Sequence, residues 1–164
     1  RAILNTANEI KSDLSLIKSV IKSNEKRSTI LIQRIFKILN GKLKNKKICL
    51  LGVTFKANTD DMRESSSLKI IPALSKKGAL ITYYDPTGQK KEFNKIKNVQ
   101  FKPSIKTACE NSDLIIIHTE WNDFKSIDYK KILKRKNFKI YDMRNIYSSE
   151  KMKKDQIKYF SIGR

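Results

Sequence analysis

The sequence is poor in the residues from which metal centres, catalytic triads and disulfide scaffolds are built. It has one histidine, His118, and two cysteines, Cys49 and Cys109, among 164 residues. These counts argue against a histidine-based or Cys-rich metal site, a Ser-His-Asp triad and a disulfide-stabilised fold. No apolar run approaches the roughly 18 residues that a membrane-spanning helix needs, and no signal peptide is visible. We expect a cytoplasmic protein with no metal site and no membrane partner.

Acidic residues are scarce relative to basic ones. Lys and Arg number 36 and Asp and Glu 16, which gives a formal net charge of +20. Such a charge suggests a polyanion such as nucleic acid as partner. The lysines, however, are spread over nearly every segment, and no basic cluster is interleaved with aromatic residues that could stack on bases. The abundance of Lys, Ile and Asn also fits AT-rich coding, so we expect solvated lysine faces and no specific nucleic-acid partner.

The middle and end of the chain alternate short apolar runs with helical patterns. An apolar content of 39% is too high for a disordered tail. We expect strands at 48–53, 79–84, 99–101, 114–118, 138–141 and 157–162, and helices at 68–74, 103–111 and 129–135. The run at 114–118 is apolar on both faces, which is typical of a buried parallel strand. Strands that alternate with helices predict an α/β fold with a Rossmann-like, doubly wound and mainly parallel sheet.

A long helix is predicted at 3–40, ahead of this sheet. Its apolar residues follow the heptad spacing of a packed seam: Ile3, Ala7, Ile10, Leu14, Ile17 and Ile21. The helix could dock on its own domain, or it could form a dimer interface or the link to an upstream domain. The chain opens with Arg1 inside this pattern, so we expect a part of a longer protein. We divide it into a helical region, 1–40, and a sheet domain, 41–164.

Ligands of open α/β sheets bind beyond the carboxyl ends of the strands. The loop after the first predicted strand carries Lys56 and Arg63 but lacks the glycines of a dinucleotide fingerprint, since Gly52 stands alone. It ends in a serine run, and serines there are expected to cap the next helix, whose free amides attract phosphate. Cations and an aromatic residue also follow the later strands, so this edge suits an anion with a ring. Spacing alone favours a plainer interpretation, in which Arg63 only pairs with a neighbouring aspartate.

Four motifs resemble those of the nucleotide-sugar dehydrogenases, the UDP-glucose/GDP-mannose dehydrogenase family. Residues 52–68 match the signature G-x-x-F-K-x-x-T-x-D-x-R-E-S, and the segments 78–86, 118–124 and 142–147 agree in order and spacing. The resemblance covers nearly the whole chain. It implies the carboxyl-terminal, UDP-binding domain of such an enzyme, with part of the helix through which the family forms homodimers. The motifs look most like the branch that acts on UDP-glucose, with UDP-N-acetylmannosamine or GDP-mannose as alternative substrates.

The resemblance also implies roles for single residues. Phe55, Lys56 and Arg144 match positions that bind the nucleotide sugar, and Arg63 matches one that reaches the cofactor NAD. Family members oxidise the sugar with NAD, and a glucuronate product would feed surface polysaccharide synthesis.

The catalytic cysteine of the family is matched by neither Cys49 nor Cys109, and the NAD-binding domain lies outside this sequence. We therefore expect no catalytic residue here and no activity from this chain alone. Glu120 and Trp121 lie on the same edge without an assigned role.

Overall fold

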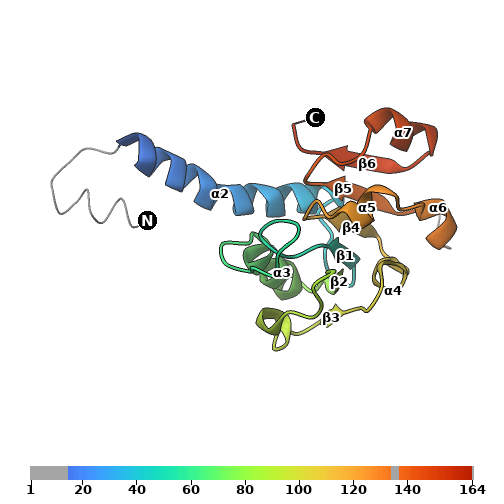
Figure 1. Ribbon diagram of the computed structural model, residues 1–164, viewed down its shortest axis with the longest axis horizontal. Helices are drawn as coiled ribbons and strands as arrows, with labels where there is room; N and C mark the ends of the chain where they lie inside the picture. The colour runs from blue at the N-terminus through green and yellow to red at the C-terminus, as the bar shows by residue number, and fades with distance from the viewer. Residues whose placement is uncertain (1–14, 134–136, 164) are drawn as a thin grey trace.

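Six parallel strands form the centre of the computed structural model, which describes residues 15–133 and 137–163 (Figure 1). The strands are β1 (Lys47–Leu51), β2 (Leu80–Tyr84), β3 (Val99–Phe101), β4 (Leu114–Ile117), β5 (Lys139–Asp142) and β6 (Lys158–Ser161). They lie in the order β3-β2-β1-β4-β5-β6, with every neighbouring pair parallel. This is the strand order of the doubly wound dinucleotide-binding fold. The predicted Rossmann-like α/β class is therefore confirmed.

Helices cover both faces of the sheet. Alternate residues of β1 enter opposite cores: Ile48 and Leu50 pack in one cluster, and Cys49 and Leu51 in the other. The first cluster is covered by α2 (Ser15–Ile38) and α3 (Ser67–Lys76). The second is covered by α4 (Ile105–Cys109), α5 (Asn122–Lys125), α6 (Tyr129–Ile132) and α7 (Ser149–Lys154). Every residue of β4 is buried, which explains its unbroken apolar sequence.

The carboxyl-terminal half of α2 belongs to the core of the domain. Leu31 and Ile35 are buried against the sheet. The guanidinium of Arg34 donates to the main-chain oxygen of Ser161 at 2.6 Å and lies 5.6 Å from the ring centroid of Tyr141. These contacts fix the end of the helix on β5 and β6.

The earlier turns of α2 extend away from the sheet (Figure 1). Val20 there is 52% exposed, and Ile30, which lies beside the buried Leu31 in the docked half, is 59% exposed. The helix therefore docks on its own domain at one end and leaves apolar side chains uncovered in both halves. The predicted helical residues 3–14 lie outside the described residues.

The structure differs from the sequence-based expectation in its short elements. The helices α5 and α7 and the 3-10 turn Lys91–Phe93 were not predicted, because elements of three to six residues show no hydrophobic period. The helix expected from residue 103 begins at Ile105 instead. Ser104 caps it by accepting a hydrogen bond from the Thr107 amide at 3.2 Å, so Pro103 lies just ahead of the cap.

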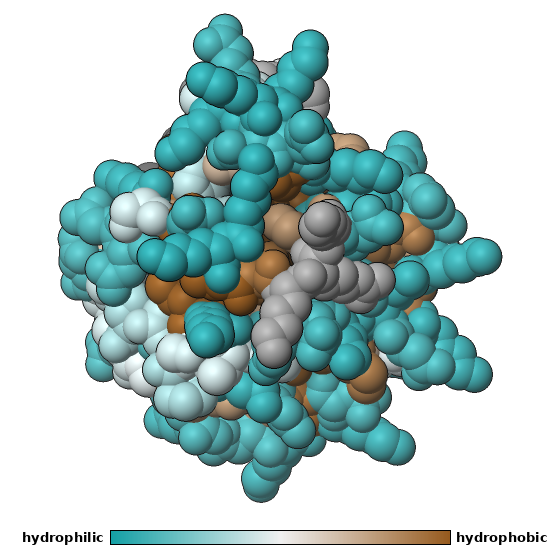
Figure 2. Space-filling model, turned by 90° about the vertical axis from the view of Figure 1, so that its right-hand side faces the viewer, coloured by the Kyte–Doolittle hydropathy of each residue, from teal (hydrophilic) through white to brown (hydrophobic). Residues whose placement is uncertain are grey.

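The surface is mainly hydrophilic on the face that carries α6, and apolar side chains gather there in a hollow (Figure 2). The polar cover is spread over the whole view, in line with lysines that occur in nearly every segment of the sequence. Within the described ranges, no helix combines the length and the apolar character that crossing a bilayer requires. His, Cys, Asp and Glu side chains of those ranges do not gather in threes as metal ligands would.

Candidate functional site

The loops that follow β1 and β4 meet at Gly52 and Thr119. Gly52 has φ +74°, and a Cβ atom on it would lie 2.5 Å from the Cβ of Thr119. Its amide donates to the oxygen of Tyr84 at the end of β2. In dinucleotide-binding folds a glycine at this place lets the backbone approach a pyrophosphate. Here Gly52 instead lets the backbone approach Thr119 of the same chain.

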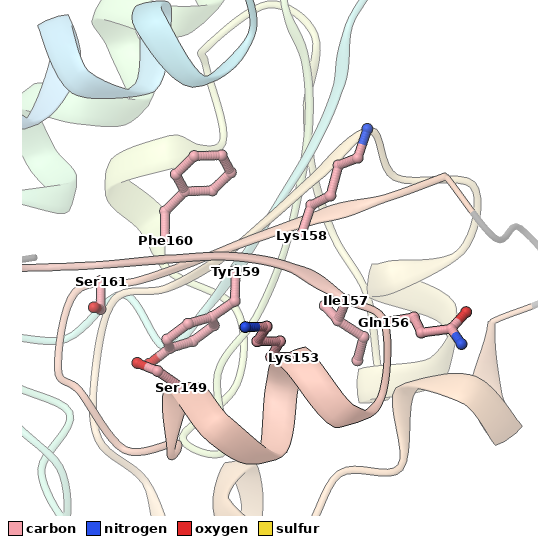
Figure 3. Close-up of a pocket in the computed structure, with 8 residues that line it drawn as sticks. All are labelled: Ser149, Lys153, Gln156, Ile157, Lys158, Tyr159, Phe160 and Ser161. Atoms are coloured by element: carbon pink, nitrogen blue, oxygen red, sulfur yellow. The ribbon is translucent and has the colours of Figure 1, made fainter.

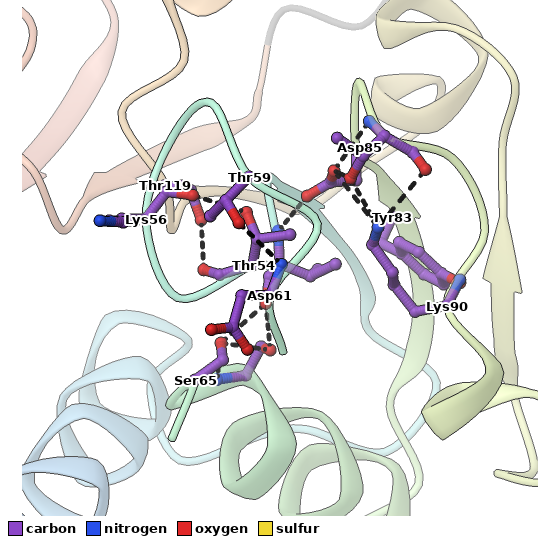
Figure 4. A network of polar contacts seen from close by, with 12 residues as sticks. Thr54, Lys56, Thr59, Asp61, Ser65, Tyr83, Asp85, Lys90 and Thr119 are labelled. Atoms are coloured by element: carbon purple, nitrogen blue, oxygen red, sulfur yellow. Dashed lines mark hydrogen bonds and ion pairs between the residues drawn. The ribbon is translucent and has the colours of Figure 1, made fainter. Parts of the chain in front are cut away.

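Asp85, which follows β2, fixes the start of the loop between β1 and α3, residues 52–66 (the site loop; Figure 4). Its buried carboxylate accepts from the Val53 amide at 2.8 Å and from the amide and hydroxyl of Thr87 at 3.0 and 2.5 Å. The buried ammonium of Lys90 lies 3.8 Å away. An acidic residue at this place in a dinucleotide-binding fold holds the ribose hydroxyls. Since both oxygens are engaged and Gly52 stands alone, the described residues do not fit a complete NAD site.

The loop between β1 and α3 is ordered by its own hydrogen bonds. The amide of Phe55 donates to the oxygen of Asp61 at 2.9 Å, and the Asp61 amide donates to the Thr59 hydroxyl at 3.1 Å. The hydroxyl of Thr54 donates to the oxygen of Lys56 at 3.1 Å. The side chains of Phe55, which is 49% exposed, and Lys56 are thereby left open to solvent on a fixed backbone.

The serine at the N-cap position of α3 does not cap the helix as predicted, although the Ser67 amide donates to the Ser65 hydroxyl at 3.3 Å. Ser66 occupies the N-cap position but makes no capping bond, and its hydroxyl lies 2.8 Å from Nε2 of His118. The hydroxyls of Ser65 and Ser67 both donate to the oxygen of Val53, at 2.7 and 2.5 Å. The serine run therefore ties the end of the site loop back to its beginning and to β4.

Arg63 pairs with Asp61, the interaction that its spacing favours. Nε and Nη2 of the guanidinium donate to the two carboxylate oxygens at 3.0 and 2.9 Å. These hydrogen bonds lower the pKa of Asp61 to about 2. The side chain of Arg63 is 89% exposed, so the pair faces solvent on the outer part of the loop.

Arg144 brings the loops after β1, β4 and β5 together. Its Nε donates to the main-chain oxygen of His118 at 2.8 Å and lies 2.9 Å from a carboxylate oxygen of Glu120. Its Nη2 donates to the main-chain oxygen of Phe55 at 3.4 Å. The buried carboxylate of Asp142 holds the arginine backbone by accepting its amide at 2.9 Å. Phe55 and Arg144, both predicted to bind substrate, are therefore neighbours.

The buried titratable groups near this edge are not poised for acid–base or nucleophilic chemistry. Burial, with the charge of Arg144, lowers the pKa of His118 to about 3. Burial also raises the pKa of the Cys49 thiol, whose sulfur lies 3.7 Å from that of Cys109. A neutral imidazole and two enclosed cysteine side chains fit structural roles, as the sequence indicated.

Sequence reasoning missed the carboxylates that shape the site. Asp85 follows β2 directly and Asp142 is the last residue of β5, and that position at the strand end was the available signal. Glu120 was placed on this edge without a role, and it pairs with Arg144. Trp121 is only 9% exposed and packs in the second core cluster.

A cavity of about 540 Å³ lies elsewhere, between α7 and β6 (Figure 3). Lys153 and Tyr159 are among the residues that line it, and the other six are Ser149, Gln156, Ile157, Lys158, Phe160 and Ser161. It contains none of the four predicted binding residues. It runs along a strand at the edge of the sheet rather than beyond the carboxyl ends of β1 and β4.

Comparison with known proteins identifies the domain. Residues 49–149 match the model of the UDP-binding domain of the UDP-glucose/GDP-mannose dehydrogenase family. The chain is 38% identical over 165 residues to the UDP-glucose 6-dehydrogenase of Rickettsia typhi. That match covers 99% of the chain and 38% of the relative, so the chain spans little more than a third of the relative's length.

Solved structures agree on the fold. A UDP-glucose dehydrogenase from Pyrobaculum islandicum superposes with a TM-score of 0.78 at 23% identity, over 97% of this chain and 34% of that one. A UDP-D-ManNAc dehydrogenase from Pyrococcus horikoshii gives 0.73 at 26% identity, over 96% of this chain and 36% of that one. Both are sugar-nucleotide enzymes by name. The range that the family model matches, 49–149, holds all four predicted site residues. The chain belongs to the UDP-glucose/GDP-mannose dehydrogenase family and contains its UDP-binding domain.

Proposed function

We propose that this chain is the substrate-binding, carboxyl-terminal domain of an NAD-dependent UDP-glucose 6-dehydrogenase, which oxidises UDP-glucose to UDP-glucuronate. The contact between Arg144 and Phe55 carries the proposal, because it joins the loops after β1 and β5 beyond the carboxyl ends of the strands. A nucleotide bound at this edge would meet residues from both loops.

Phe55, Lys56 and Arg144 are the proposed contacts to the sugar nucleotide. The diphosphate needs positive charge, which Lys56 supplies as a mobile ammonium and Arg144 as a planar, oriented guanidinium. The exposed ring of Phe55 can pack on a sugar or a base. These residues bind and orient, while the reacting carbon would lie toward the part of the enzyme outside this chain.

Arg63 is the proposed contact to NAD. The described residues offer no further part of a dinucleotide cradle, so the cofactor would be held chiefly by the rest of the enzyme. When bound there, NAD would take up the hydride released from the sugar. Arg63 is suited to reach outward because its side chain is 89% exposed on the site loop. Its pairing with Asp61 holds the guanidinium in one orientation.

The exposed apolar residues of α2 support a homodimer through this helix. Val20, in the first half of the helix, and Ile30, beside the buried Leu31, are both exposed. We place the boundary between the helical region, 1–40, and the sheet domain, 41–164, where the chain turns through Asn40 and Gly41. Both have positive φ, at 54° and 75°.

A calorimetric titration of this chain with UDP-glucose tests the binding assignment. Lys56→Ala is expected to weaken binding by about 10- to 100-fold, because a hydrogen bond to a charged group contributes about 1.5–3 kcal/mol. Lys69→Ala is the matched control, since Lys69 is also an exposed lysine but lies on α3. Equal affinities for both variants would overturn the assignment of Lys56.

The identity of the sugar and the reaction are tested on the complete protein by NADH formation. UDP-glucose should be oxidised faster than UDP-N-acetylmannosamine and GDP-mannose at equal concentrations. A faster reaction with either of the other two sugars would assign the protein to a different branch of the family. DNA binding whose affinity falls steeply as salt rises, without any binding of nucleotide sugars, would point instead to a nucleic-acid-binding module that uses the charge of +20.

A further inference from the structure

The chain's one histidine lies at the centre of the candidate site but is closed off from solvent. His118 is 2% exposed and follows β4 directly. Nε2 lies 2.8 Å from the hydroxyl of Ser66, and Nδ1 lies 3.0 Å from the hydroxyl of Thr119. Both ring nitrogens are therefore engaged by the protein, which leaves neither for a substrate proton.

The hydroxyl of Thr119 sets the tautomer of the ring. It donates its single proton to the main-chain oxygen of Thr54 at 3.0 Å. It can therefore only accept from His118, so Nδ1 must carry a proton. In a neutral ring Nε2 then has a free lone pair, which accepts the hydroxyl proton of Ser66. All these hydrogen bonds consequently have defined directions.

The environment keeps the ring neutral. Burial is the main cause of the low pKa of His118, about 3, and the nearby charge of Arg144 lowers it further. A second proton would have to enter on Nε2 and reverse the hydrogen bond from Ser66. The arrangement therefore does not change over the range of pH in which a free histidine titrates.

The segments tied together by this residue are those that carry the proposed ligand contacts. Its main-chain oxygen accepts from Arg144. Through Thr119 its ring fixes the oxygen of Thr54, whose own hydroxyl donates to the oxygen of Lys56. The position of Lys56 thus depends on the neutral side chain of His118, and the guanidinium of Arg144 is held by the main-chain oxygen of the same residue.

We propose that His118 is a positioning residue: its neutral imidazole, protonated on Nδ1, positions the loop that carries Lys56, and its main-chain oxygen holds Arg144, so that both cations can bind one nucleotide sugar. The proposal rests on the proposed function for its ligand, but the state of the ring is independent of it. A general acid or base would need a ring nitrogen open to the substrate, and His118 has none in this arrangement.

The state of the ring can be read directly, because a protein with one histidine gives one set of imidazole nitrogen signals in NMR. The expected result is a protonated Nδ1 and an unprotonated Nε2, unchanged between pH 7 and 5. A protonated Nε2, or a titration near the ordinary pKa of 6.5, would overturn the proposal.

Two substitutions separate the two sides of the ring. His118→Asn keeps an amide donor near the place of Nδ1, whereas His118→Gln keeps an acceptor near that of Nε2. Because the part of the site loop that carries Lys56 is reached through Nδ1 and Thr119, whereas Nε2 contacts only Ser66 at the end of the loop, the Asn variant should bind UDP with nearly unchanged affinity. The Gln variant should bind about five- to tenfold more weakly, as expected for one lost hydrogen bond. The reverse order would contradict the proposal, and thermal unfolding of each variant checks that it is folded.

A double-mutant cycle distinguishes positioning from general stabilisation. Lys56→Ala should weaken UDP binding less in the Gln background than in the original chain, because Lys56 is already displaced there. Lys69→Ala should show no such coupling. Additive effects for both lysines would show that His118 only stabilises the fold.

Failure of the proposed function has a different outcome from failure of the positioning role. If the unsubstituted chain does not bind UDP, the proposed ligand is wrong. The positioning role is then decided by hydrogen exchange of the Phe55 amide, which donates to Asp61 within the site loop. Faster exchange in the Gln variant than in the Asn variant supports it, and equal rates refute it.

Discussion

A Cβ atom added to Gly52 would lie 2.5 Å from the Cβ of Thr119, closer than two such atoms can approach. The residue also has φ +74°, in the left-handed region that disfavours side chains. Gly52→Ala should therefore combine backbone strain with a steric clash between the loops after β1 and β4. We expect a loss of about 3 kcal/mol in the free energy of unfolding, measured by urea denaturation.

Gly88→Ala is the matched control for the backbone. Gly88 has φ +86°, but a Cβ there would have no heavy atom within 4 Å. This variant should lose only about 1–2 kcal/mol, the cost of a left-handed alanine. Equal losses for the two variants would show that the contact with Thr119 relaxes freely and that only the backbone demands glycine.

The burial of His118 makes the stability of the chain depend on pH. The pKa of His118 in the folded chain, about 3, lies below the ordinary value of 6.5. Below pH 6.5 the histidine of the unfolded chain is therefore protonated, whereas that of the folded chain stays neutral. Stability is then full above pH 6.5 and falls as the pH drops toward 3. Between pH 7 and 5 the expected loss is about 2 kcal/mol, since one pKa unit corresponds to about 1.4 kcal/mol.

Urea denaturation at pH 7, 6 and 5 measures this loss, and His118→Asn provides its control. The variant has no histidine, and carboxylates titrate mainly below this range. Its stability should be nearly flat from pH 7 to 5, although lower overall. A slope equal to that of the original chain would assign the pH dependence to other groups.

The alternation of strands and helices was enough to predict the fold class. Right-handed parallel crossovers leave few arrangements for such a chain, and the apolar run of β4 indicated a central strand. The short helices α5 and α7 could not be predicted, because their formation depends on packing of Phe124 and Met152 into the second core. Nor could periodicity show that α2 docks at one end only, since its apolar residues continue along the whole helix.

The location of the site could be predicted from the sequence, but the contacts between its residues could not. The ends of β1 and β5 indicated Lys56 and Arg144 because ligands of open sheets bind there. The contacts of Arg144, however, reach Phe55 and His118 across 89 and 26 positions of sequence. Local spacing predicted the Arg63–Asp61 pair, whose partners are two residues apart, and cannot predict pairs set by the packing of strands.

The buried thiols should resist modification in the folded chain. Cys49 and Cys109 are both fully buried, and burial raises the pKa of Cys49, so the reactive thiolate is disfavoured. Reaction with a thiol-specific disulfide reagent should therefore proceed no faster than unfolding and should release two thiols together. Rapid reaction of one thiol under native conditions would contradict this and would reopen the question of a nucleophile in this domain.

Substitutions of Glu120 and Arg144 should change ligand binding in opposite directions. The carboxylate of Glu120 lies 2.9 Å from Nε of Arg144 and is 41% exposed, so it reduces the positive potential that a diphosphate would meet. Glu120→Gln should tighten UDP binding severalfold, while stability changes by less than about 1 kcal/mol, as is usual for exposed ion pairs.

Arg144→Lys should have the reverse effect. A lysine keeps the charge but cannot donate to the oxygens of His118 and Phe55 from one planar group, as the guanidinium does. UDP binding should weaken by about tenfold, the effect of one charged hydrogen bond, although the net charge is unchanged. Calorimetry on the two variants separates the alternatives. If charge alone matters, the lysine variant binds like the original chain; if the orientation of the guanidinium matters, it does not.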